Sequence, residues 1–174
     1  VTSTDVDAGA VLTYSISGGA DATKFTIDLN TGVLSFLAAP DYEAPTDAGT
    51  YNVYDVIVQV SDGSFTDTQA ISVTVTPVND NAPVITSNGG GASAAISVAE
   101  NAAAVTTVTA TDADLPAQTL TYSISGGADA AMFSINASTG ALSFLAAPDH
   151  EAPTDANADN VYDVVVQVSD GSLT

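Results

Sequence analysis

The chain has 174 residues, of which 21 are Asp or Glu and only one is Lys or Arg, giving a formal net charge of −20 at pH 7. Binding to nucleic acid or to an anionic membrane depends on Lys and Arg, so this composition excludes both kinds of partner. There is no Cys, which excludes disulfides and thiolate metal sites, and no apolar run approaches the ~18 residues of a membrane-spanning helix.

Two copies of one sequence unit follow each other along the chain. Residues 12–22 recur unchanged at 120–130, residues 34–41 recur at 142–149, and residues 54–64 recur at 162–172 with one Ile-to-Val change. A repeat of this length is domain-sized and should contain its own core. We therefore predict a repeat at 1–78 that lacks its N-terminal strands, a linker with a flexible entry at 79–91, and a repeat at 92–174 that lacks its C-terminal strand. Both would belong to a longer tandem array.

Apolar and polar residues alternate with period two in short segments, which is typical of half-buried strands. These segments are 71–76, 120–124, 133–135, 142–144 and 161–169, with counterparts of the last four in the first copy. No stretch of ten residues has helical periodicity with caps, and residues 38–47 and 146–159 are predicted to be irregular connections. About seven strands per complete repeat predict an all-β fold of two tandem antiparallel Greek-key β-sandwiches of the immunoglobulin-like type. The predicted core is Tyr14, Ile16, Phe25, Ile27, Leu34, Phe36, Val56, Val58 and Val60, with their counterparts 108 residues later.

The three Glu residues occur only in short acidic motifs, although the chain contains 18 Asp. The motifs are Asp41-Tyr42-Glu43, Glu100-Asn101 and Asp149-His150-Glu151. A solvating acidic surface would scatter Glu and Asp alike. Glu can bind Ca²⁺ through both of its oxygens, so this placement indicates calcium sites.

Pairs of Asp two residues apart form a second pattern. Asp112 and Asp114 would point the same way on an extended chain, and Asp5 and Asp7 repeat the arrangement. Without a cation between them, two carboxylates this close suppress each other's ionisation. The structural alternative is that such Asp residues only end strands and cap turns.

Other acidic and oxygen-bearing residues divide into three groups. Asn79-Asp80-Asn81 places three oxygen-bearing side chains in a row, and Pro83 then restricts the backbone. Asp62-Gly63 and Asp170-Gly171 are typical of hairpin turns. The remaining Asp residues assigned to solvated surface are Asp21, Asp28, Asp55, Asp67, Asp129, Asp155 and Asp163.

Taken together, these motifs resemble the calcium motifs of cadherin repeats, and the resemblance covers essentially the whole chain as two incomplete repeats of the bacterial cadherin-like kind. It rests on Glu-Asn at 100–101, Asp-x-Glu at 41–43 and 149–151, Asn-Asp-Asn-Ala-Pro at 79–83, Asp-x-Asp at 112–114 and Val-Ser-Asp-Gly at 168–171. Two positions depart from the family pattern. Pro77 stands where the family has Asp, and the Leu-Pro-Ala-Gln loop after Asp114 lacks the usual Asn.

The resemblance implies Ca²⁺ as the bound ion, held between successive repeats. For the joint inside this chain it implies Asp41, Glu43, Asp80, Asp112, Asp114 and Asp170, with the side-chain oxygen of Asn79 and the backbone carbonyl of Asn81. Glu100, Asp149 and Glu151 would serve a joint with a following repeat. Asp5, Asp7 and Asp62 would serve a joint with a preceding one.

The sequence favours a module that is not an enzyme. Its only His is His150, which copy one replaces by Tyr42, and the absence of Trp argues against a sugar-binding platform. The favoured function is a calcium-stiffened spacer in a large bacterial surface or secreted protein, located outside the cell. The alternative is an adhesin module that binds a partner itself, either homophilically or through carbohydrate, and an accessory domain of an extracellular enzyme is a third reading. The expected partners are neighbouring repeats of the same chain, with other surface proteins or polysaccharide as further candidates.

Overall fold

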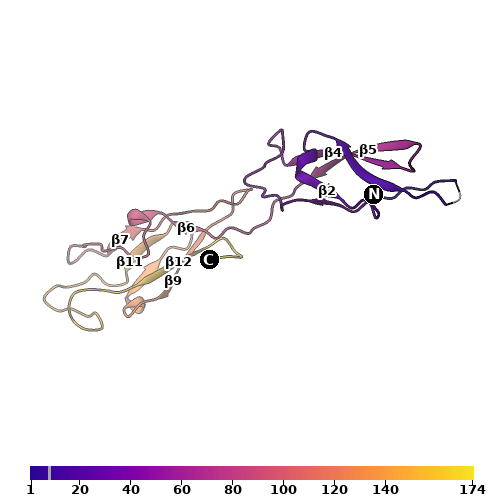
Figure 1. Cartoon of the computed structure of the whole chain (residues 1–174). Coiled ribbons are helices and arrows are strands. Elements are labelled where there is room, and N and C mark those ends of the chain that lie inside the picture. Colours follow the sequence, from indigo (N-terminus) through magenta and orange to yellow (C-terminus); the bar gives the residue numbers. More distant parts are fainter. Residues whose placement is uncertain (8) are drawn as a thin grey trace. The chain divides into compact units, whose positions relative to one another are not determined.

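The computed structural model describes residues 1–7 and 9–174. These residues divide into two compact units, Val1–Val78 and Asn79–Thr174 (Figure 1). Both units consist of antiparallel strands and short 3₁₀ turns, so the prediction of an all-β fold is confirmed.

The first unit has two antiparallel sheets. One sheet has the strand order β1-β4-β5, and the other pairs β2 with β3. Tyr14 lies opposite Val60 between β1 and β4, and Val56 lies opposite Ile71 between β4 and β5. The elements are β1 (Thr13–Gly18), η1 (Ala22–Lys24), β2 (Phe25–Ile27), β3 (Leu34–Phe36), β4 (Val53–Ser61) and β5 (Thr66–Thr74).

The second unit repeats this framework and adds strands that precede it in the sequence. Its sheets have the orders β10-β11-β7, β12-β9 and β6-β8. Tyr122 lies opposite Val168, which is the register of Tyr14 and Val60 moved by 108 residues. The elements are β6 (Val84–Ile85), η2 (Ser87–Gly89), β7 (Ala104–Thr107), β8 (Ala110–Thr111), β9 (Thr121–Gly126), η3 (Ala130–Met132), β10 (Phe133–Ile135), β11 (Ala141–Phe144) and β12 (Val165–Ser169).

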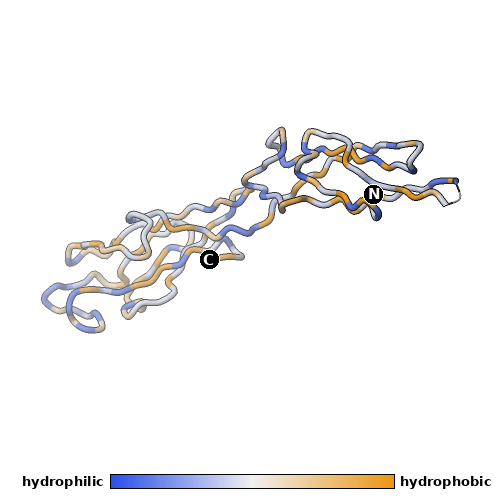
Figure 2. Tube along the Cα trace, viewed as in Figure 1, coloured by the Kyte–Doolittle hydropathy of each residue, from blue (hydrophilic) through white to orange (hydrophobic). Residues whose placement is uncertain are grey.

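Each unit has an aromatic cluster in its core. The Phe25 and Phe36 rings stack with centroids 4.5 Å apart, and Tyr54 meets both rings edge-on. Tyr54 is only 1% exposed, yet it was not among the predicted core residues, because its position at the start of β4 gave no sign of the loop that covers it. Phe133, Phe144 and Tyr162 repeat the cluster in the second unit. Figure 2 shows hydrophobic residues along the strands and hydrophilic residues at the turn of the long loop between β11 and β12.

The strand predicted at 161–169 is shorter than expected, because β12 begins only at Val165. In the first unit, the counterpart residues 53–56 pair with β5 alone, since the pairing with β1 starts at Ile57. The counterpart of β5 would begin at Thr174, so residues 161–164 have no ladder partner among the described residues. A groove of about 640 Å³ lies beside them, lined also by residues 94–98.

Candidate calcium sites

The turn after β12 fixes the Asp170 carboxylate. Its Oδ1 atom accepts hydrogen bonds from the backbone N–H groups of Ser172 and Leu173, each at 2.6 Å. These bonds, that of Leu173 foremost, hold the pKa of Asp170 below its ordinary value. Asp62 occupies the same turn in the first unit. The hairpin reading of Asp-Gly is therefore correct locally, and the turn leaves the second carboxylate oxygen for other contacts.

Asp112 and Asp114 follow β8 and differ in how far they are buried. Asp114 is only 2% exposed, whereas Asp112 is half-buried. Oδ1 of Asp112 accepts the backbone N–H of Asp114 at 2.9 Å, which is the contact that Asp5 makes with Asp7 in the first unit. The pair thus forms a local turn rather than a simple extended strand.

Asn81 holds the buried Asp114 carboxylate. Its side-chain Nδ2 donates to Oδ1 of Asp114 at 2.7 Å, and its backbone N–H lies 3.2 Å from both carboxylate oxygens. The Asn81 side-chain bond is the main reason that the pKa of Asp114 is lowered, while burial and the charge of Asp170 act in the opposite direction. Asp114 is therefore ionised at neutral pH despite its burial.

The carboxylates of Asp112, Asp114 and Asp170 converge. One oxygen from each lies within 4.8 Å of the others. Oδ2 of Asp112 is buried and has no hydrogen-bond partner, which is unfavourable for a polar atom unless something else satisfies it. Ca²⁺ takes carboxylate and amide oxygens as ligands, so an orphaned oxygen in an all-oxygen cluster fits this ion.

Asn79 adds an amide to this cluster. The amide atom that faces the cluster lies 3.0 Å from Oδ2 of Asp170 and 3.3 Å from Oδ2 of Asp114. Gln118, in the loop after Asp114, contacts the other side of the same amide. Asp80 is exposed, and its Oδ1 accepts Nδ2 of Asn81 at 3.1 Å.

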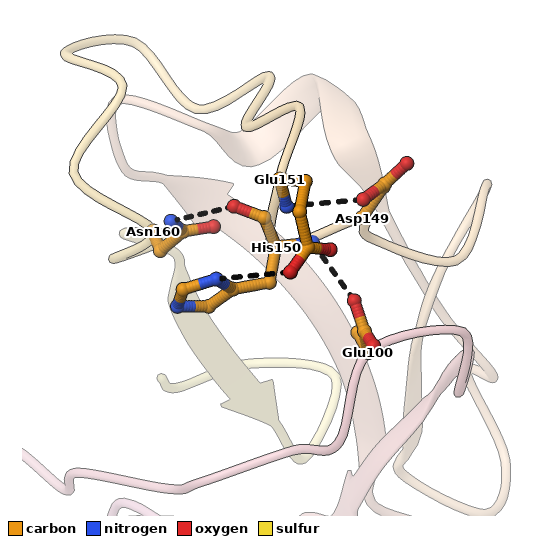
Figure 3. Close-up of polar contacts among 5 residues, drawn as sticks. All are labelled: Glu100, Asp149, His150, Glu151 and Asn160. Atoms are coloured by element: carbon orange, nitrogen blue, oxygen red, sulfur yellow. Dashed lines mark hydrogen bonds and ion pairs between the residues drawn. The ribbon is translucent and has the colours of Figure 1, made fainter.

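A second acidic cluster contains Glu100, Asp149 and Glu151, all of them exposed, with one oxygen from each within 4.8 Å of the others. Figure 3 shows them around the backbone of His150. The His150 N–H donates to Oε2 of Glu100 at 3.3 Å, and the Glu151 N–H donates to Oδ1 of Asp149 at 3.0 Å. In the sequence, Asp149 and Glu151 lie in the loop before β12, and the Asp170 turn follows that strand.

The backbone of residue 150, rather than its side chain, organises this cluster. Nδ2 of Asn160 donates to the His150 carbonyl at 3.2 Å, and Asn52 donates to the Tyr42 carbonyl at 2.9 Å in the first unit. The imidazole is largely exposed and reaches only a 4.0 Å contact with Glu151. Because the backbone makes this contact, it forms with either side chain at the position. This accounts for the presence of His150 in one copy and Tyr42 in the other.

Buried Asp residues hold the loop that carries the second cluster by accepting hydrogen bonds from its backbone. The assignment of Asp129 and Asp155 to solvated surface is therefore wrong. Asp129 is 4% exposed and accepts the backbone N–H groups of Ala156 and Asp163 at 2.7 and 2.8 Å. Asp155 is 6% exposed and accepts those of Asp159 and Asn160. Burial raises the pKa of Asp155, but these backbone bonds outweigh it and the pKa lies below its ordinary value.

The first unit contains the same arrangement, in which a buried Asp accepts hydrogen bonds from the backbone of a loop. Asp21 is 3% exposed, so its assignment to the surface is also wrong, and it accepts the N–H groups of Ala48 and Asp55. Asp28, Asp55, Asp67 and Asp163 are exposed as expected. For Asp21 and Asp129 no sequence signal marked the burial, because each accepts a hydrogen bond from a loop 27 residues away.

The remaining predicted ligands lie in the first unit. The Glu43 N–H donates to Oδ1 of Asp41 at 3.0 Å, which is the arrangement of Asp149 and Glu151. Within Val1–Val78, the described residues do not bring Asp5, Asp7 and Asp62 together as a group of three carboxylates. Val6 between the two Asp residues is fully exposed.

Tandem antiparallel β-sandwiches with acidic turns flanking their strands define a class of modular repeat proteins. Residues 94–174 match the family model of the cadherin domain. The chain is 32% identical over 97% of its length to human "Protocadherin Fat 1", of which it spans 4%, so it corresponds to a small part of that relative. These matches identify the chain as a cadherin-like repeat protein.

Solved structures agree with this assignment of the fold. "Human Protocadherin-24 EC1-2 Form II" matches 93% of the chain and 72% of that structure, with a TM-score of 0.63 at 24% identity. "Protocadherin gammaB7 EC3-6 cis-dimer structure" matches 96% of the chain and 41% of that structure, with a TM-score of 0.62 at 25% identity. Among the described residues, no helix has the length and apolarity needed to cross a membrane.

Proposed function

We propose that the chain is a calcium-binding pair of cadherin-like repeats that acts as a stiffened spacer in an extracellular adhesion protein. The observation that carries this proposal is the buried, unpartnered Oδ2 of Asp112 beside the carboxylates of Asp114 and Asp170. A group of ionised carboxylates without a neutralising cation is unfavourable, and Lys24 is the only Lys or Arg in the chain. A divalent cation is the counter-charge that best suits this composition, and screening by high external salt is the alternative.

The proposed ligands in the second unit are Asp112, Asp114 and Asp170, with Asn79 and Asn81 supplying further oxygens. Ca²⁺ takes ~6–8 oxygens at ~2.3–2.6 Å, so we propose that further ligands complete its coordination. Asp80, also in the second unit, and Asp41 and Glu43, in the first, are the further proposed ligands. Glu100, Asp149 and Glu151 are proposed to bind Ca²⁺ together with a following repeat. The proposed ligands of a preceding joint are Asp5, Asp7 and Asp62.

The proposed consequence is mechanical. Ions that need ligands from two successive repeats restrict the motion of one repeat relative to the next, while each hydrophobic core persists without them. Extracellular calcium modules bind with dissociation constants of roughly 10⁻⁴ to 10⁻³ M, far above cytosolic calcium concentrations. An extracellular or cell-surface location is therefore part of the proposal, as is a non-catalytic role.

Calcium titration calorimetry and small-angle scattering test this function together. We expect calcium to bind in the millimolar range or tighter and to narrow the distribution of interdomain distances, and we expect chelation to broaden it. Asp112→Asn should weaken calcium binding about tenfold or more, because it removes one charge and one ligand. Asp67→Asn, an exposed change on β5, is the matched control. Identical scattering curves with and without calcium would refute the stiffening role.

A second candidate is direct self-association. One similar structure is titled a cis-dimer, and the likeness to adhesion-type relatives supports a binding role for some copies of the repeat. Near-identity of the two copies favours the spacer, because a recognition surface would be expected on one copy only. Aggregation of beads coated with the chain, with and without calcium, separates the two. Calcium-dependent clustering would favour the binding role.

A further inference from the structure

The turn between β10 and β11 contains an acceptor motif for N-linked glycosylation. Residues 136–138 are Asn-Ala-Ser, which fits the pattern of Asn, any residue except Pro, and then Ser or Thr. The motif occurs once in the chain, because no other Asn has Ser or Thr two positions later. A motif this short also arises by chance, and what gives it weight is the position of Asn136 in the structure.

The exposed Asn136 side chain uses only one of its two polar atoms in the turn. Its Oδ1 accepts the backbone N–H groups of Ser138 and Thr139, each at 3.0 Å. Its Nδ2, the atom to which a glycan is attached, has no hydrogen-bond partner among the residues that the structure describes. Residues 136–139 are all exposed, so the acceptor atom lies on an open part of the surface.

The backbone of this turn is fixed by hydrogen bonds that a glycan would leave intact. The Asn136 N–H donates to the Ala141 carbonyl, and the Asn136 carbonyl accepts the Gly140 N–H, both at 2.9 Å. Attachment of a glycan replaces one hydrogen of Nδ2 and leaves Oδ1 as an acceptor. The folded unit therefore accommodates the modification without losing a hydrogen bond of the turn.

The first unit forms the same turn with an acid in place of the amide. Asp28 occupies the position of Asn136, and its Oδ1 accepts the N–H groups of Asn30 and Thr31 at 3.0 and 2.7 Å. The turn itself therefore needs only a side-chain oxygen at this position. Its Nδ2 group is an addition that folding does not use.

The two copies differ at three successive positions in this turn. Residues 28–30 are Asp-Leu-Asn, whereas residues 136–138 are Asn-Ala-Ser. The first change supplies the acceptor amide and the third supplies the hydroxyl that the motif requires. The middle change places Ala137 where the first copy has Leu29, a side chain that is 56% exposed, and so removes bulk beside the amide.

We propose that Asn136 is a site of N-linked glycosylation, modified by an oligosaccharyltransferase of the secretory pathway that uses a lipid-linked oligosaccharide. A bond forms between Nδ2 of Asn136 and C1 of the first sugar, and the bond from that carbon to the lipid pyrophosphate breaks. The pyrophosphate leaves as an anion, and Nδ2 loses one proton to the enzyme. This inference rests on the extracellular location in the proposed function, but on none of the calcium ligands.

The modification would make two near-identical copies chemically different. It adds a bulky, hydrophilic group to the β10–β11 turn of the second unit, while the corresponding turn of the first unit has no acceptor. Residues 136–139 belong to neither acidic cluster of the second unit, so we expect calcium binding to be unchanged by the glycan.

Secretion of the whole chain from cultured eukaryotic cells, behind a cleavable signal sequence, tests the site. We expect an intact mass that exceeds the polypeptide mass by one N-glycan, and we expect peptide-N-glycosidase to remove the excess. That enzyme leaves Asp in place of the glycosylated Asn, so peptide mass spectrometry locates the site. Translation into microsomal vesicles gives the same readout without export.

Two variants remove the motif and keep the turn. Ser138→Ala removes the required hydroxyl but keeps the backbone N–H that Oδ1 accepts. Asn136→Asp reproduces the turn that Asp28 forms in the first unit. We expect both variants to be folded by circular dichroism and to carry no glycan. Ser134→Ala removes an exposed hydroxyl two positions before the acceptor and, as the matched control, should keep the glycan.

Two results overturn the inference: an unchanged chain that passes through the secretory pathway without a glycan, and a glycan that persists in Asn136→Asp. Either would leave the proposed calcium function intact, because calorimetry of the same material measures calcium binding independently. A glycosylated chain that binds no calcium would overturn the proposed function and support Asn136 as an acceptor.

Discussion

Individual carboxylates in the second unit are fixed by hydrogen bonds before any cation is considered. Asp114 depends on Asn81, and Asp170 depends on the backbone of its own turn. Both have a pKa below the ordinary value of 3.8. A carboxyl whose pKa is lower in the folded state stabilises the fold above its unfolded pKa, and this contribution disappears as the pH falls through the folded pKa.

The lowered pKa of these carboxyls determines how the stability of the second unit depends on pH. In the presence of chelator, the urea midpoint of the second unit should be constant above about pH 5 and should fall as the pH drops below about 4. Asp114→Asn should flatten this acid limb, because its amide does not titrate in that range, whereas Asp163→Asn at an exposed position should not. Fluorescence-monitored urea unfolding at several pH values is the measurement. An acid limb unchanged by Asp114→Asn would contradict the assignment.

At the scale of elements, the loop between β11 and β12 is ordered by buried acids rather than by regular secondary structure. Asp129→Ala would leave the N–H groups of Ala156 and Asp163 without an acceptor. We expect a loss of about 1–3 kcal/mol for each buried donor left unpaired, with faster amide exchange in residues 149–160. Asp163→Ala removes an exposed carboxylate from the same region and should change stability by less than about 0.5 kcal/mol.

Residues 161–164, which have no ladder partner among the described residues, provide a second test at this scale. A copy of residues 67–76 appended after Thr174 should pair with β12 and extend it back to Val161, as β5 does for β4. Burial of the copied Ile71, Val73 and Val75 side chains should raise the stability of the second unit by about 1 kcal/mol or more, or ~4–8 °C in Tm. The same extension with Ser at those three positions is the control. Unchanged amide exchange at residues 161–164 would show that the strand does not form.

For the whole molecule, the net charge of −20 sets the response to ions. If calcium binds with a dissociation constant of roughly 10⁻⁴ to 10⁻³ M, then about 10 mM calcium should add ~1.4–2.7 kcal/mol per bound ion. NaCl at the same ionic strength screens the charge without filling the sites, and Mg²⁺ demands a stricter octahedral geometry. Differential scanning calorimetry in the three salts checks this. Equal stabilisation by NaCl would show that screening alone is responsible.

The sequence by itself determined the repeat and its strands, because both are encoded locally. Period-two alternation and identical segments 108 residues apart give identical registers, as the Tyr14–Val60 and Tyr122–Val168 pairs show. The motifs also predicted the acidic residues that cluster, although their role as ligands stays a prediction. The strands and the repeat depend on neighbours close in the chain or on the same pattern repeated, whereas the acidic groups, whose members lie far apart in the chain, were expected from the resemblance to cadherin repeats.

Only the tertiary structure decided which Asp residues are buried and what the linker amide contacts. Asp21 and Asp129 look like any exposed Asp until a distant loop folds over them. Residues 161–164 alternate like a strand, but they lack a partner within the described chain, so a ladder forms only from Val165. Asn79 meets Gln118 through a fold that brings together residues 39 positions apart. Burial and hydrogen-bond partners of this kind are long-range properties, which local sequence patterns do not contain.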